Sequence, residues 1–354
     1  MKKHNFSAGP CILPYEVMQQ AAQAVQELDG SGLSLIEISH RSAAFIEIMD
    51  KACALALELL GLTDKGYKAL FLQGGASTQF LATAYNLLEN KGAYLNTGTW
   101  STKAIKEANL LGEVVEVASS AGANFNYIPK EYSVPADADY LHITTNNTIF
   151  GTQIKTLPKT DAVLASDSSS DIFSRQLDFS KFGILYAGAQ KNMGPAGTTL
   201  VVVKEEVLDK VTHKIPSMLD YALHGSKDSM FNTPPVFAVY TSMLTLDWLQ
   251  KLGGIKAIEE KNNTKADLMY GEIDRNPLFK GFAAVEDRSM MNATFTLEKA
   301  ELKERFDSMC ADALINGING HRSVGGYRAS MYNALPLASV QTLVDVMKEL
   351  ERTA

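Results

Sequence analysis

Three short apolar runs, each ending abruptly, constrain the fold of this chain more than any other feature. Residues 69–72 stop at a pair of glycines, residues 162–165 stop at Ser166 and Asp167, and residues 184–187 lead into a glycine-rich segment. Short apolar runs with such ends are typical of strands buried on both faces of a sheet. A fourth run follows after a short connection, and we expect it to return antiparallel to the third.

Helical patterns alternate with these runs. Apolar residues recur at helical spacing over residues 45–60, 80–88 and 237–252, and the first and last of these patterns end at glycine. Strands that alternate with helices predict an α/β fold with a mainly parallel mixed sheet flanked by helices.

The last third of the chain indicates a second, smaller unit. It contains a long polar helix, one strand, two further helices and a glycine-rich segment, expected at residues 256–275, 292–297, 299–314, 340–350 and 317–326. We therefore expect a large domain over residues 16–260 and a small α+β C-terminal domain over residues 261–354. An N-terminal segment, residues 1–15, is expected to pack with the small domain.

Charge and composition exclude several classes of protein. The 354 residues include 33 Lys+Arg against 40 Asp+Glu, a formal charge of -7, so we expect no nucleic-acid or anionic-lipid partner. With no apolar stretch of membrane-span length and no signal-peptide core, we expect no membrane association and a cytoplasmic location. The three distant cysteines, Cys11, Cys53 and Cys310, indicate buried, inert thiols rather than a disulfide framework or a zinc motif.

Lys191 is the first candidate for chemistry. It follows the apolar stretch 182–187 and has Gly188, Gly194 and Gly197 around it, residues that let backbone approach a ligand closely. A lysine in such a pocket can lose its proton near neutral pH and form a Schiff base with a carbonyl. A loop lysine between two strands explains this segment equally well.

Two further segments suit the same chemistry. The glycine turn of residues 73–78 feeds a helix whose N-terminus could bind phosphate, although Ser77 or Thr78 could simply cap that helix. Asp167 ends a buried strand, where ligands of α/β sheets bind; taken alone, a helix cap or a solvated acid explains it better. Together, a lysine and an acid for the ring nitrogen are the groups that pyridoxal phosphate requires.

Basic residues gather in two segments. These segments contain His40 and Arg41, and His321, Arg322 and Arg328. Arginine matches the oxygens of carboxylates and phosphates, so the clusters suit a doubly anionic substrate, although isolated segments of this kind more often form surface ion pairs. No carboxylate or cysteine cluster accompanies the histidines, and we expect no metal.

Taken in order, these motifs resemble the phosphoserine aminotransferases, pyridoxal phosphate enzymes of the same fold type (I) as aspartate aminotransferase. The matching stretches cover nearly the whole chain and lie at residues 5–10, 39–42, 146–151, 167–169, 187–197, 231–235 and 320–330.

The resemblance implies a role for each candidate residue. Lys191 would carry pyridoxal phosphate as a Schiff base and move the proton, and Asp167 would pair with the pyridine nitrogen. Trp100, otherwise a core aromatic, would stack on the ring. The remaining cofactor contacts would be Thr148 at the phenolic oxygen, Ala76, Ser77 and Gln190 at the phosphate, and Asn232 and Thr233 reaching it from a neighbouring subunit.

The implied reaction is a ping-pong transamination in serine biosynthesis, from L-glutamate to 3-phosphohydroxypyruvate, within a homodimer that shares its active sites. A phosphorylated hydroxythreonine, used in pyridoxine biosynthesis, is a further possible substrate. Arg328 would bind the α-carboxylate, and the distal anion would bind the residues His40, Arg41, His321 and Arg322. Some family members carry an arginine in the glycine turn where this chain has Ser77.

Four alternatives differ in their support from the residues. Another aminotransferase of this fold type, acting on a small amino acid, is a rival within the same fold. A cysteine desulfurase needs a reactive cysteine in a mobile loop, and none of the three cysteines matches. Lys191 and Asp167 argue against a non-catalytic phosphate-binding paralogue, and no G-x-G-x-x-G follows a strand as in a dinucleotide dehydrogenase.

Overall fold

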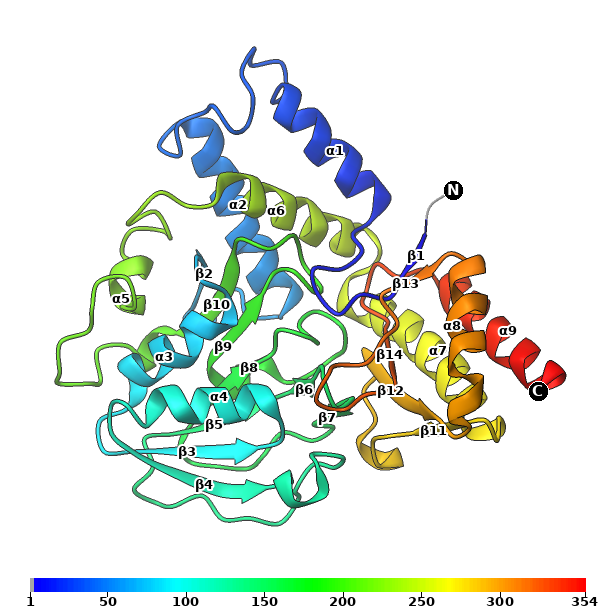
Figure 1. Ribbon diagram of the computed structural model, residues 1–354. Helices are drawn as coiled ribbons and strands as arrows, with labels where there is room; N and C mark the ends of the chain where they lie inside the picture. Colours follow the sequence, from blue (N-terminus) through cyan, green and yellow to red (C-terminus); the bar gives the residue numbers. More distant parts are fainter. Residues whose placement is uncertain (1–2) are drawn as a thin grey trace.

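A mixed seven-stranded sheet forms the centre of the computed structural model, which describes residues 3–354 (Figure 1). Its order is β2 (Tyr67–Leu72), β10 (Thr199–Lys204), β9 (Phe182–Gly188), β8 (Val163–Asp167), β5 (Tyr140–Thr144), β3 (Lys91–Asn96) and β4 (Glu113–Ser119). Neighbouring strands are parallel except around β10, which runs antiparallel to both β9 and β2. The prediction of a mainly parallel mixed sheet with an antiparallel return is confirmed.

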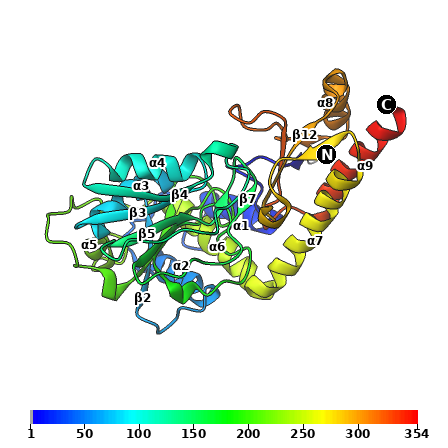
Figure 2. The ribbon, with the colours of Figure 1, turned by 90° about the horizontal axis from the view of Figure 1, so that it is seen from below.

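Two hydrophobic cores lie on opposite faces of this sheet, as the alternation of side chains along a strand requires. In β2, Ala69 and Phe71 belong to one core, whereas Leu70 and Leu72 belong to the other. The first core contains α1 (Tyr15–Gln26), α2 (Ala43–Leu59) and α6 (Val236–Lys251), and the second contains α3 (Gly75–Leu87) and α4 (Thr99–Ala108). Figure 2 shows α3 and α4 on one side of the sheet and α2 and α6 on the other. The short helix α5 (Tyr221–Gly225) packs near β2.

Strands β3, β4 and β5 carry no simple apolar run, and the sequence did not predict them. Strand β5 includes His142, whose Nε2 lies 2.8 Å from the hydroxyl of Tyr186 in β9. Burial lowers the pKa of His142 to about 3, so the ring is neutral and tolerates the core. One ring nitrogen of this buried polar residue is paired two strands away, whereas its Nδ1 has no hydrogen-bond partner among the described residues.

A second unit surrounds a three-stranded antiparallel sheet of β11 (Phe279–Gly281), β12 (Asn292–Leu297) and β14 (Tyr327–Ser330). Its helices are α7 (Gly254–Arg275), α8 (Lys303–Asp312) and α9 (Leu337–Thr353). These elements share a hydrophobic core of their own, which also buries Phe6. Strand β1 (His4–Asn5) pairs with β13 (Ile315–Asn316), so the N-terminal segment joins this unit; residues 1 and 2 lie outside the described range.

Smaller elements complete the architecture. The helix expected over residues 299–314 is a 3₁₀ turn, Ala300–Leu302, followed by α8. Other 3₁₀ turns occupy Ala121–Ala123, Phe179–Lys181, Glu205–Val207 and Val285–Asp287, and a small hairpin is formed by β6 (Asn146–Asn147) and β7 (Thr152–Gln153). Within residues 3–354, no helix combines the length and apolar character that a membrane crossing demands.

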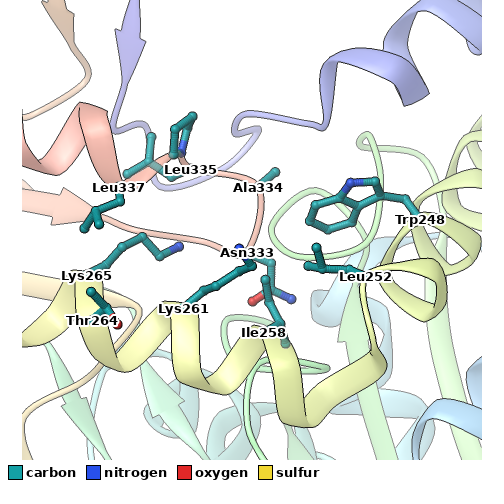
Figure 3. A pocket seen from close by; sticks show the side chains of 11 residues that line it. Trp248, Leu252, Ile258, Lys261, Thr264, Lys265, Asn333, Ala334, Leu335 and Leu337 are labelled. Carbon is teal, nitrogen blue, oxygen red and sulfur yellow. The ribbon is translucent and has the colours of Figure 1, made fainter.

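Helix α7 meets the segment after β14 beside a cavity of about 290 Å³ (Figure 3). There Lys265, only 2% exposed, donates hydrogen bonds to the carbonyls of Met331 (3.0 Å) and Tyr332 (2.8 Å). Burial lowers the pKa of Lys265 to about 7. The backbone N–H of Asn333 donates to Oδ1 of Asn192 (3.0 Å), which ties the second unit to the loop after β9.

The glycine turn after β2 determines where α3 begins. Gly74, not Ser77 or Thr78, is the N-cap, and its φ of 97° lies in the left-handed region that glycine favours. A Cβ atom at Gly74 would lie 2.0 Å from Oγ1 of Thr78. Because no side chain caps α3, its first N–H groups keep their capacity to donate to a ligand.

We expect Gly74→Ala to lower the free energy of unfolding by about 3 kcal/mol, because it combines left-handed strain with the clash against Thr78. Gly61→Ala is the matched control: its φ is 65°, but no atom lies within 4 Å of the added Cβ. That control should cost only about 1 kcal/mol. Urea unfolding measures both, and equal losses would contradict the steric argument.

Candidate active site

A cavity of about 350 Å³ opens at the carboxyl ends of β8 and β9 and gathers most of the predicted site residues. The predicted residues that line it are Ala76, Ser77, Trp100, Thr148, Asp167, Gln190, Lys191, His321 and Arg328. They come from segments far apart in the chain and from both units of the fold. Parallel strands bring their carboxyl ends to one edge of a sheet, which is why β8 and β9 contribute neighbouring groups.

Lys191 lies in the turn that follows β9. Its Nζ donates a hydrogen bond to Oγ1 of Thr148 (2.8 Å) and lies 5.8 Å from the centre of the Trp100 ring. Burial lowers the pKa of Lys191 to about 8, although the negative charge of Asp167 acts in the opposite direction. With that pKa, roughly a tenth of the amine is neutral at pH 7 and can attack a carbonyl.

Asp167 is the last residue of β8 and is 4% exposed, so it is not a solvated loop acid. Its Oδ1 accepts a hydrogen bond from the N–H of Ser169 (2.9 Å), within a turn rather than at a helix cap. Burial raises the pKa of Asp167, while the charge of Lys191 and the Ser169 hydrogen bond lower it. The carboxylate also lines the cavity, so it can pair with a ligand cation.

Unused donors and a helix N-terminus make the rest of the cavity suitable for anions. The first turn of α3 contributes Gly75, Ala76 and Ser77 at the positive end of the helix dipole. Nε1 of Trp100 and Nε of Arg328 are buried, and neither has a hydrogen-bond partner among the described residues. The cavity can therefore hold a carbonyl near Lys191, a ring cation at Asp167 and phosphate or carboxylate oxygens around its walls.

Five predicted residues do not line this cavity in the single chain. His40 and Arg41 precede α2, and Asn232 lines a different cavity beside Tyr221 and His224. Thr233 and Arg322 are exposed. Their predicted roles require a second subunit or a moved loop.

Two of the three glycines around Lys191, Gly194 and Gly197, pack against a helix. A Cβ at Gly194 would lie 2.3 Å from Oγ of Ser242, and one at Gly197 would lie 3.2 Å from Cβ of Ala238. Both neighbours belong to α6. These two glycines therefore let a helix approach the loop.

Three contacts around Lys191 were not predicted from the sequence. At Gly9, with φ 136°, an added Cβ would lie 3.3 Å from Cγ of Lys191. The thiol of Cys11 donates to the carbonyl of Lys191 (2.7 Å), and the hydroxyl of Ser169 accepts from the N–H of Gly188 (3.1 Å). No local signal marked the first two, because 180 positions separate Cys11 from Lys191.

The three cysteines are free thiols, but Cys11 and Cys53 are only partly buried, so the predicted burial is correct for Cys310 alone. Burial of the sulfur atoms raises the pKa of each thiol to about 12. In residues 3–354 no group of three His, Cys, Asp or Glu side chains could hold a metal ion.

Comparisons with known proteins agree along the whole chain. A family model described as aminotransferase class-V matches residues 3–343. The chain is 65% identical over 353 residues to the phosphoserine aminotransferase of Flavobacterium johnsoniae, covering 99% of both chains. The solved phosphoserine aminotransferase of Bacillus circulans subsp. alkalophilus is 41% identical with a TM-score of 0.96, over 99% of both chains. Another, studied for radiation damage of its Schiff base, is 43% identical with a TM-score of 0.96, over 100% of this chain and 99% of that one.

We expect the amine of Lys191 in the cofactor-free protein to react with an acylating reagent with a midpoint near pH 8. In Asp167→Asn the midpoint should fall further, because the carboxylate charge that favours the ammonium is gone. Peptide mass spectrometry across a pH series measures the labelling, with Lys191→Arg as the control that loses the signal. A midpoint near the ordinary value of 10.5 would contradict the burial argument.

Proposed function

Because the chain belongs to the phosphoserine aminotransferases of the class-V aminotransferase family, we propose which of its residues carry out that reaction. The family transfers the amino group of L-glutamate to 3-phosphohydroxypyruvate and forms 2-oxoglutarate and O-phospho-L-serine, with pyridoxal phosphate as cofactor. The single observation that carries the proposal is Lys191, a lysine of lowered pKa in a cavity that also contains a buried acid.

The side chains of the cavity fit pyridoxal phosphate. An amine, a buried carboxylate and a helix N-terminus match its aldehyde, its ring nitrogen and its phosphate, and Nε1 of Trp100 is an unused buried donor beside them. When bound, the cofactor supplies an aldehyde for the amino group and a ring that withdraws electrons. Lys191, Asp167, Trp100, Thr148, Ala76, Ser77 and Gln190 would hold it.

Lys191 has two tasks in this proposal. Its neutral amine would hold the cofactor through the aldehyde, and the same amine, when free, would take the proton from the substrate Cα. The hydroxyl of Thr148, 2.8 Å from Nζ, orients the amine toward the cavity. Asp167 would keep the pyridine nitrogen of the cofactor protonated. Its burial would strengthen the attraction between the carboxylate and the ring cation, because little water screens the two charges.

Arg328 is proposed to bind the α-carboxylate of the substrate. Its side chain reaches the cavity from β14, where one terminal nitrogen donates to the carbonyl of Thr148 (3.4 Å). The unused Nε adds a second donor of the kind that a bidentate carboxylate accepts. His321 lines the same cavity and, with Arg322, is proposed to bind the distal anion.

His40, Arg41, Asn232 and Thr233 are proposed to act across a homodimer interface. All four lie outside the Lys191 cavity of their own chain. Large apolar side chains in the same regions are exposed, among them Leu33 (50%), Ile36 (63%) and Phe237 (37%). Exposed apolar groups of this size favour contact with another protein surface.

The proposal also divides the chain into an N-terminal segment (residues 1–15), a large cofactor-binding domain (16–260) and a small domain (261–354). The separate core that buries Phe6 with α7, α8 and α9 supports this division. A cytoplasmic location and a reaction without metal stay predictions.

We expect the purified enzyme, with L-glutamate as donor, to use 3-phosphohydroxypyruvate with kcat/KM about 100-fold above that for hydroxypyruvate, because charged hydrogen bonds to the phosphate are lost. Lys191→Ala should lower turnover by about 10⁴-fold or more. A coupled 2-oxoglutarate assay measures both. Equal kcat/KM values for the two acceptors would contradict the substrate assignment.

Lys191→Ala and Arg41→Ala subunits, each impaired alone, should form active hybrids when mixed if the active sites are shared. Half of the dimers are then hybrids, and each hybrid has one intact site out of two. The mixture should therefore show about a quarter of wild-type activity. Refolding the two variants together and assaying turnover tests this. Activity no higher than the mean of the separate variants would contradict an Arg41 contribution across the interface.

A further inference from the structure

Lys103 is a cation beside Trp100, which lines the active-site cavity, and none of the roles above uses it. It lies on α4 three residues after Trp100, a spacing that places both side chains on one helix face. Its Nζ is 4.7 Å from the centre of the Trp100 ring, and Nζ of Lys191 is 5.8 Å from the same centre. The indole therefore adjoins both the reacting amine and Lys103.

Lys103 belongs to a cluster of basic side chains that also contains His321, Arg322 and Arg328. Burial lowers the pKa of His321, and the positive charges of Arg328, Arg322 and Lys103 lower it further. Within residues 3–354 none of the four forms an ion pair. His321 contacts the hydroxyl and the N–H of Ser323, Arg328 donates to a backbone carbonyl, and Lys103 lies over the indole ring. In a chain of net charge -7, such a cluster without carboxylates indicates an anionic ligand.

We propose that Lys103 is a specificity-determining residue that binds the distal phosphate of the substrate; this rests on the function proposed above. A substrate with its Cα at Lys191 and its α-carboxylate at Arg328 extends its phosphate away from the lysine. The indole that adjoins Lys191 also adjoins Lys103, so the far end of a three-carbon substrate comes within reach of that ammonium.

The chemistry of the cluster explains why this cation is needed. Burial and the neighbouring cations lower the pKa of His321 and favour its neutral form, so it offers a phosphate dianion a hydrogen bond rather than a full charge. The glycine turn offers Ser77 rather than a cation. Arg322 and Lys103 then remain as the charges that the single chain provides at the distal end.

A competing explanation is that Lys103 only clamps Trp100 through its cation–π contact. The two explanations differ in their dependence on the substrate. A clamp acts on every substrate equally, whereas a phosphate ligand affects only phosphorylated ones.

The experiment compares the wild-type holoenzyme with Lys103→Met, Lys103→Arg and Lys106→Met, the last being a control on the same helix. KM and kcat are measured for 3-phosphohydroxypyruvate and hydroxypyruvate, and calorimetry measures binding of O-phospho-L-serine and L-serine. We expect Lys103→Met to raise KM for the phosphorylated acceptor, and to weaken O-phospho-L-serine binding, by about tenfold. It should leave kcat and both unphosphorylated ligands unchanged.

Lys103→Arg should recover most of the loss, and Lys106→Met should behave as wild type. Equal losses for phosphorylated and unphosphorylated ligands would overturn the inference in favour of the clamp, and no loss at all would overturn it outright. If the wild type itself fails to prefer 3-phosphohydroxypyruvate, the proposed function fails and this inference with it. If the wild type prefers 3-phosphohydroxypyruvate and Lys103→Met has the same KM as the wild type, the inference about Lys103 is refuted and the proposed function stands.

Discussion

The attraction between the ammonium of Lys191 and the carboxylate of Asp167, both within one cavity, is the interaction on which the site depends. Removing either charge from water costs free energy, and the burial shifts the pKa of each group toward its neutral form. Their mutual attraction offsets part of that cost. The fold holds Lys191 and Asp167 close together because β8 and β9 are parallel neighbours. At the ends of these strands, the hydroxyl of Ser169 also accepts a hydrogen bond from the N–H of Gly188.

The second unit of the fold completes the cavity rather than merely lying beside it. Arg328 donates a hydrogen bond to the carbonyl of Thr148, and the hydroxyl of Tyr332 donates to the carbonyl of Ala8 (2.7 Å). The N–H of Asn333 donates to Oδ1 of Asn192. These contacts bring residues 328–333, Ala8 and Thr148, which are distant in sequence, close to Lys191. Cys11 also contacts the loop that carries Lys191, because its thiol donates to the carbonyl of Lys191. The raised pKa of this thiol makes Cys11 unsuited to act as the nucleophile of a desulfurase.

Local patterns predicted the elements whose burial is uniform. Strands β8 and β9 are apolar runs, α2 has a clear helical period, and the structure contains each within a few residues of the expected bounds. Strands β3, β4 and β5 escaped prediction because their sequences mix polar and apolar residues. His142 in the core is paired with the hydroxyl of Tyr186, and this contact depends on how the strands are arranged in the sheet.

The sequence by itself determined the class of fold and, through the segment around Lys191, the candidate chemistry, because strand runs, glycine turns and functional motifs are local patterns. Only the tertiary structure decided which groups share the cavity. It brought Gly9, Cys11 and Lys103 close to the site and left His40, Arg41, Asn232 and Thr233 outside it in the single chain. The lowered pKa of Lys191 is likewise a tertiary property, because burial and the charges of Asp167 and Arg328 produce it and none of these can be read from the neighbouring residues.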